Sequence, residues 1–95
     1  MAEKYFFLVV YDLPDDKRRT RLHKRLKDFG SPVQYSVFEC ILTSKDFLRM
    51  KAAVKKIVKT KFDHIRYYII CNSCREKIEI IGRHEVSTEP DVHVV

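Results

Sequence analysis

The chain has 95 residues, which is enough for one domain with a single core. Three cysteines, an odd number, argue against a secreted disulfide framework. No apolar run approaches the roughly 20 residues that a bilayer-spanning helix needs, and no basic-then-apolar leader is found. We therefore expect a cytoplasmic protein that has no membrane partner.

The net charge of +6 is concentrated in two stretches without acidic residues. Residues 17–27 contain Lys17, Arg18, Arg19, Arg21, Lys24, Arg25 and Lys27. Residues 49–61 contain Arg49, Lys51, Lys55, Lys56, Lys59 and Lys61. Two such stretches on one small domain predict a polyanionic partner, with nucleic acid first. The alternative for either stretch alone is a solvated helix face.

The aromatic and β-branched run at residues 5–11 predicts a strand that is buried on both faces. Asp12 follows at its C-terminal end, where sheets of α/β type tend to place ligands. Asp15 or Asp16 can cap the next helix, which Gly30 ends. The core-facing stripe of that helix is Leu22, Leu26 and Phe29.

The hydrophobic phase changes in the middle of residues 33–42, which predicts a bulge, a sharp bend or two short strands that meet tightly. Ser44 is the expected cap of a second helix, whose buried stripe is Phe47, Met50, Val54 and Ile57. Residues 64–71 and 77–81 predict two further strands that a short link joins, and residues 83–95 form a polar tail.

This order predicts an α+β, ferredoxin-like βαββαβ domain over residues 1–82, with an additional C-terminal strand. Both helices would cover one face of the sheet, so the two basic stretches would point the same way. The other face would be an open apolar patch unless something covered it. The simplest cover is a second copy, in a homodimer with the sheets packed face to face.

Asp12 is the first candidate for chemistry. One carboxylate is a poor Mg²⁺ site, but two Asp12 side chains that meet in a dimer could hold the ion against a phosphodiester. The alternative is a turn aspartate that backbone N–H groups satisfy.

The pair Cys71 and Cys74 could be half a zinc site or a redox pair, but no second ligand pair accompanies it. We favour a buried thiol at Cys71 and an incidental Cys74. The histidines, His23 included, are expected to be surface residues. Arg19, Arg21 and Arg66 suit phosphate. The aromatic residues Tyr11, Tyr35 and Phe38 suit either unpaired bases or the core.

Three segments together resemble the CRISPR-associated protein two family. They are Val9-Val10-Tyr11-Asp12-Leu13, the basic helix start at residues 17–21, and Gln34-Tyr35-Ser36-Val37-Phe38-Glu39. The resemblance extends over about residues 4–82. It implies a ferredoxin-like homodimer in which Asp12 meets its mate across the dimer axis with one Mg²⁺. It also implies that the strand at residues 77–81 adds to the other protomer's sheet.

Members of this family are described as metal-dependent endonucleases on single-stranded RNA or duplex DNA, and as bridges between two dimers of the CRISPR integrase. Tyr11, Arg19, Arg21 and Phe38 match family positions that are linked to nuclease activity. Pro32 is a departure, because some nuclease-active members carry a basic residue there.

The leading hypothesis is therefore a spacer-acquisition protein that binds DNA or RNA and cleaves it with Mg²⁺. Its catalytic set would be Asp12, Tyr11, Arg19, Arg21 and Phe38, with nucleic acid held by Lys17, Arg18, Lys24, Arg25, Lys55, Lys56 and Lys59. The alternatives are a non-catalytic duplex-binding scaffold, a toxin-like ribonuclease of the VapD type, and a generic RNA-binding or metabolite-sensing module.

Overall fold

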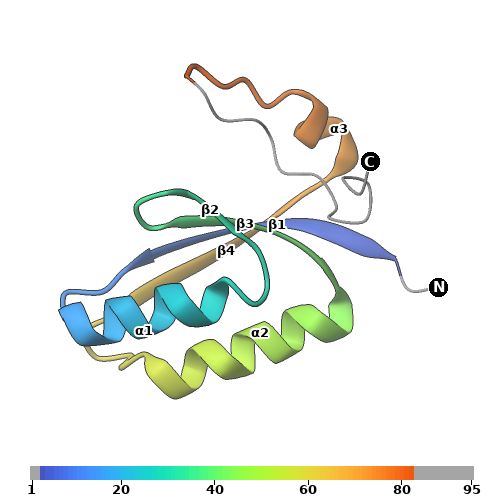
Figure 1. Cartoon of the computed structure of the whole chain (residues 1–95). Coiled ribbons are helices and arrows are strands. Elements are labelled where there is room, and N and C mark those ends of the chain that lie inside the picture. The colour runs from blue at the N-terminus through green and yellow to red at the C-terminus, as the bar shows by residue number, and fades with distance from the viewer. Residues whose placement is uncertain (1–2, 83–95) are drawn as a thin grey trace.

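A computed structural model describes residues 3–82 as a four-stranded antiparallel sheet with two long helices on one face (Figure 1). The elements in chain order are β1 (Lys4–Asp12), α1 (Asp16–Leu26), β2 (Ser31–Gln34), β3 (Val37–Thr43), α2 (Ser44–Ile57), β4 (His64–Ile70) and α3 (Asn72–Glu76). The strand order β2-β3-β1-β4 places β1 and β3 at the centre. This arrangement confirms the predicted α+β class and the helices that share one face. Among residues 3–82 we find no helix that is long and apolar enough to cross a membrane.

The core lies between the sheet and the two helices α1 and α2. Alternate residues of β1 point into it, and β3 supplies Phe38, Cys40 and Leu42 beside them. The predicted helix stripes are confirmed, because Leu22, Leu26, Met50 and Val54 are buried while Phe29, Phe47 and Ile57 pack at the margin. The rings of Phe7 and Phe47 stack with their centroids 4.0 Å apart, which fastens α2 to the centre of the sheet.

The change in apolar alternation within residues 33–42 corresponds to a tight hairpin. This agrees with the predicted alternative of two short strands that meet tightly. Strands β2 and β3 pair antiparallel across a turn at Tyr35 and Ser36, with a register shift between Pro32 and Gln34. Gly30 precedes this hairpin, where a Cβ atom would stand 2.4 Å from the Cys40 Sγ atom. Only glycine permits this close approach of the chain to β3.

The helix caps agree with the sequence in one case and differ in the other. The Asp15 carboxylate accepts a hydrogen bond from the Arg18 backbone N–H at 2.9 Å, so Asp15 caps α1. The prediction that Ser44 caps α2 is wrong. Thr43 has the extended backbone of a cap, and its Oγ1 accepts from the Asp46 N–H at 3.1 Å, while Ser44 is already helical.

The chain beyond β4 differs from the prediction. The expected short link contains the helix α3, and residues 77–81 form no strand in this single chain. Their expected partner was the sheet of a second copy, so that pairing stays a prediction. The polar tail predicted at residues 83–95 lies outside the described residues.

Candidate nucleic-acid and metal site

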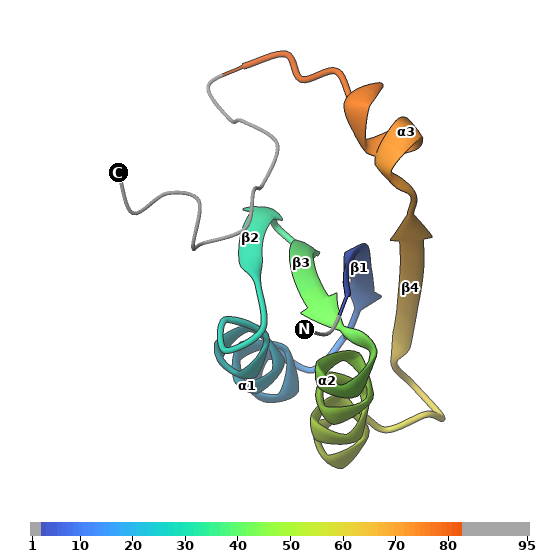
Figure 2. The same ribbon diagram turned by 90° about the vertical axis from the view of Figure 1, so that its right-hand side faces the viewer.

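The sheet face that α1 and α2 leave uncovered carries apolar side chains from the two central strands and the edge strand β4. We call it the open face. On β1, Phe6, Leu8 and Val10 alternate with the core residues, and each pairs in register with residues of β3 and β4. Tyr68, opposite Leu8 in register, remains 44% exposed. Near one end the Arg75 guanidinium of α3 lies 4.7 Å from the Phe6 ring centroid. Among residues 3–82, no other helix lies over this sheet face (Figure 2).

Asp12 lies on the same face as these apolar residues, at the end of β1. The strand alternation places it in line with Leu8 and Val10, opposite His64 of β4. Its side chain is exposed, and among residues 3–82 no hydrogen bond or ion pair reaches the carboxylate. The alternative of a satisfied turn aspartate therefore fails for Asp12, since Asp15 fills that role.

A magnesium ion fits the Asp12 carboxylate chemically, but a single chain supplies too few ligands. Mg²⁺ prefers octahedral oxygen coordination, and it commonly uses one or two carboxylates with water and phosphate oxygens. Within the described part of the chain no three His, Cys, Asp or Glu residues cluster as a metal site. The fit therefore depends on a second carboxylate from outside this chain.

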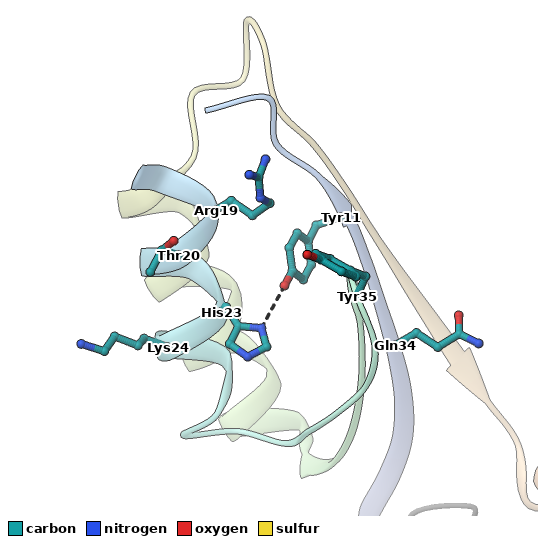
Figure 3. Close-up of a pocket in the computed structure, with 7 residues that line it drawn as sticks. All are labelled: Tyr11, Arg19, Thr20, His23, Lys24, Gln34 and Tyr35. Carbon is teal, nitrogen blue, oxygen red and sulfur yellow. Dashed lines mark hydrogen bonds between the residues drawn. The ribbon is translucent and has the colours of Figure 1, made fainter. Parts of the chain in front are cut away.

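A cavity of about 480 Å³ opens between α1 and the β2–β3 turn (Figure 3). Its walls are Tyr11, Arg19, Thr20, His23, Lys24, Gln34 and Tyr35. The Tyr11 hydroxyl lies 3.3 Å from the His23 Nδ1 atom, so the two share a hydrogen bond. Burial raises the pKa of Tyr11, which keeps its hydroxyl protonated and available as a donor.

Arg19 lies at the mouth of this cavity and also holds the start of α1. Its Nη1 donates to the Leu13 carbonyl oxygen at 2.8 Å, and its Nη2 donates to the Asp16 carboxylate. Arg21 is exposed on α1 but does not line the cavity. The structure therefore brings Tyr11 and Arg19 together and leaves Arg21 on the outer surface.

Phe38 cannot contact a substrate in this structure. Its side chain has no exposed surface, and its ring centroid lies 6.3 Å from that of Tyr11 and 5.1 Å from that of His23. The expectation that Phe38 acts at the site is corrected accordingly, because the residue supports the Tyr11–His23 pair from within the core. His23, which we expected at the surface, is half-buried and lines the cavity. Its position directly after the core residue Leu22 was the available signal.

The basic surface is built from exposed cations of both helices. Lys17, Lys24 and Arg25 are exposed on α1, Lys55 and Lys56 on α2, and Lys59 follows α2. Because α1 and α2 cover the same face of the sheet, these residues belong to one side of the domain (Figure 2).

Arg18 does not belong to this basic surface. Its Nε and Nη2 each donate to the Asp63 carboxylate at 2.9 Å, and the Asp63 side chain has no exposed surface. Asp63 also accepts from the Lys59 backbone N–H at 2.8 Å. The hydrogen bonds that Arg18 donates hold the pKa of Asp63 below its usual range. Arg18 therefore joins α1 to the loop before β4 instead of being free for phosphate.

The prediction of a buried thiol at Cys71 is wrong. Both Cys71 and Cys74 are exposed, and the buried cysteine is Cys40.

Comparison with known proteins decides the family. The model of "CRISPR associated protein Cas2" matches residues 5–78. The chain belongs to the CRISPR-associated Cas2 family. This confirms the family prediction.

Curated Cas2 relatives match over nearly the whole chain. "CRISPR-associated endoribonuclease Cas2 3" of Synechocystis sp. is 31% identical over 91 residues, covering 96% of this chain and 99% of the relative. "CRISPR-associated endoribonuclease Cas2 1" of Chloroflexus aurantiacus is 36% identical over 92 residues, covering 95% and 99%.

Solved Cas2 structures share the fold. Cas2 of Streptococcus pyogenes, crystallised at pH 6.5, superposes with a TM-score of 0.73 at 33% identity, covering 81% of this chain and 99% of that one. A chain of a partial Cas6-RT-Cas1–Cas2 complex superposes with a TM-score of 0.71 at 27% identity, covering 81% and 90%. These similarities confirm the ferredoxin-like Cas2 fold.

Proposed function

We propose that this protein acts in CRISPR spacer acquisition as a homodimer that binds nucleic acid and hydrolyses phosphodiester bonds with Mg²⁺. The observation that carries the proposal is Asp12, an exposed carboxylate on the open face that has no partner among residues 3–82. Relatives that are named endoribonucleases support the activity, and the Cas1–Cas2 complex supports an integrase partner.

A second copy packed on the open face would bury the exposed parts of Leu8, Val10 and Tyr68. Sheets pack face to face at about 10 Å, and a two-fold axis places identical residues opposite each other. An axis that passes near the end of β1 would bring the two Asp12 carboxylates together. They would share one Mg²⁺ per dimer, which when bound polarises the phosphate and lowers the pKa of bound water.

The remaining residues of the site would bind and position the nucleic acid. Lys17, Arg21 and Lys24 are exposed on α1 and suit backbone phosphates. Tyr35 is 92% exposed at the β2–β3 turn and offers a ring on which an unpaired base can stack. Arg19 would hold the start of α1 in place beside Asp12 through its bond to the Leu13 carbonyl.

The test is a cleavage panel of RNA, single-stranded DNA and duplex DNA, with Mg²⁺ or a chelator. We expect Asp12→Asn to lower metal-dependent cleavage by at least about 100-fold, because it removes the negative charge from the ligand. Asp46→Asn is the matched control, since the Asp46 carboxylate pairs with Arg49 on α2, and neither residue belongs to the proposed site or its nucleic-acid contacts. Cleavage by Asp12→Asn at the wild-type rate would overturn the assignment.

A second candidate function is a non-catalytic duplex-binding scaffold for the integrase. It is favoured by the exposed lysines Lys55, Lys56 and Lys59 and by Pro32 at a position that is basic in some nuclease-active members. Binding without cleavage in the same panel would decide for this candidate.

Both candidates require the basic surface, and charge reversal tests it. Reversing Lys55, Lys56 and Lys59 to Glu should reduce duplex affinity. It should also make the salt dependence of binding less steep by about 3 for each chain of the dimer that contacts the duplex, because each phosphate contact contributes about one. Lys45→Glu, at the start of α2 outside this group, is the control. An unchanged salt slope in the triple variant would remove these lysines from the binding surface.

A further inference from the structure

Two exposed cysteines lie where β4 passes into α3. Cys71 directly follows the strand and is the N-cap of α3, with an extended backbone at φ −69° and ψ 164°. Cys74 follows three residues later, in the first turn. The Cys74 backbone N–H donates to the Cys71 Sγ atom at 3.4 Å, and the Ser73 Oγ atom lies 3.2 Å from the same sulfur. The turn therefore brings the backbone of Cys74 to the Cys71 sulfur.

The three cysteines of the chain differ in exposure and in thiol pKa. Hydrogen bonds from Ser73 and Cys74 lower the pKa of Cys71 to about 7. The hydrogen bond with Cys71 raises the pKa of Cys74. Burial raises the pKa of Cys40 to about 12, so that thiol is inert. The exposed pair thus combines a thiol that is partly ionised near neutral pH with a protonated neighbour.

The position of the pair in the fold gives its oxidation a structural consequence. Helix α3 contacts the sheet through the Arg75 guanidinium over the Phe6 ring, at the end of the open face. A covalent bond between Cys71 and Cys74 would close the first turn of α3 beside Arg75. It would fix the path along which the chain leaves β4 (Figure 1).

We propose that Cys71 and Cys74 form a redox-active dithiol, which closes to an intramolecular disulfide by exchange with a small-molecule disulfide such as oxidised glutathione. The proposal stands independently of the proposed nuclease function. It rests on the position of both thiols in one turn, their exposure and the contact of the Cys74 N–H with the Cys71 sulfur.

The chemistry proceeds in two exchanges. The Cys71 thiolate attacks one sulfur of the external disulfide, which breaks its S–S bond and releases one thiolate. Cys74 then loses its proton to solvent and attacks the Cys71 sulfur, which releases the second thiolate. Overall, the two protein thiols are oxidised, one small-molecule disulfide is reduced to two thiols, and the reverse reaction restores the dithiol.

The test uses the full chain incubated with oxidised glutathione, quenched with acid and analysed by intact mass and peptide mapping. We expect a product with the mass of a single chain that has lost two hydrogens, with the new bond between Cys71 and Cys74 and with Cys40 still reduced. Cys74→Ser should stop at one glutathione adduct on Cys71, because the second exchange lacks its nucleophile. Cys71→Ser should form its adduct at Cys74 more slowly.

Alkylation kinetics provide a second measurement. At pH 7, Cys71 should react roughly three-fold faster than an unperturbed thiol, since greater ionisation outweighs the lower nucleophilicity of its thiolate. Mixed adducts on both cysteines without closure, or disulfides only between chains, would overturn the proposal. Equal alkylation rates at Cys71 and Cys74 would also contradict it.

Discussion

The two faces of the central sheet differ in how far one chain completes them. On the helix-covered face, Val9 of β1 and Phe38 of β3 have no exposed surface. On the open face, the alternate β1 residues Leu8 and Val10 are only half-buried, and Asp12 has no partner among residues 3–82. One set of side chains on β1 is thus buried in the core of the single chain. The alternate set stays partly exposed on the open face.

This difference shows where the stability and the proposed function of the domain arise. Removing a residue from the helix-covered face should cost folding free energy, because its contacts are all internal. Changing a residue on the open face should leave the single chain folded and affect assembly or chemistry.

Phe38→Ala should destabilise the domain by about 4 kcal/mol, because the change leaves a cavity beneath Tyr11 and His23. Chemical denaturation measures the change. Leu48→Ala is the control, since Leu48 is 61% exposed and should change stability little. If Phe38→Ala were as stable as the wild type but had lost nucleic-acid binding, Phe38 would be a nucleic-acid contact and not a core residue.

Asp63→Asn should cost about 3 kcal/mol near neutral pH, because it leaves the Arg18 guanidinium without its buried counter-charge. The folded-state pKa of Asp63 is lowered, so this contribution is complete above the unfolded pKa of about 4. It is lost as the pH falls through the lower folded-state value.

Stability measured between neutral pH and acid should therefore fall more steeply in the wild type than in Asp63→Asn. The exposed pair between Asp46 and Arg49 offers the control, and Asp46→Asn should change stability by no more than about 0.5 kcal/mol. Parallel pH profiles of the wild type and Asp63→Asn would contradict the role of the Arg18–Asp63 pair.

Leu8→Glu should weaken the proposed dimer by roughly 100-fold or more, because it buries an unpaired charge at the centre of the packed sheets. The single chain should stay folded, since Leu8 lies outside the core cluster. Leu48→Glu, on the surface of α2, should leave the association unchanged. Equal sedimentation of both variants and the wild type would exclude the open face as the interface.

Elements that depend on local pattern could be predicted from the sequence, and contacts between distant segments could not. Apolar spacing located β1, α1 and α2 because each buries one regular stripe. The Arg18–Asp63 pair joins residues 45 positions apart, and no local pattern indicates it. Thr43 and Ser44 are neighbours, and both side chains carry a hydroxyl that can cap a helix. Which of them caps α2 depends on which residue has the extended backbone, and the sequence does not show this.

The candidate site divides in the same way. Asp12 could be singled out because a lone acid ends an apolar strand, and the family resemblance strengthened that choice. The Tyr11–His23 hydrogen bond, the burial of Phe38 and the exposure of Cys71 follow from how α1, the hairpin and α3 pack on the sheet. The pairing of residues 77–81 depends on a second chain, which one sequence does not contain.

In the proposed dimer, Asp12 supplies half of a metal site that the second copy completes. Calorimetric titration of Mg²⁺ into the full chain, with a nucleic-acid substrate analogue present, measures this directly. We expect one specifically bound ion for every two chains, and loss of that ion in Asp12→Ala. Binding of one ion per chain, or the same stoichiometry in Asp12→Ala, would contradict it.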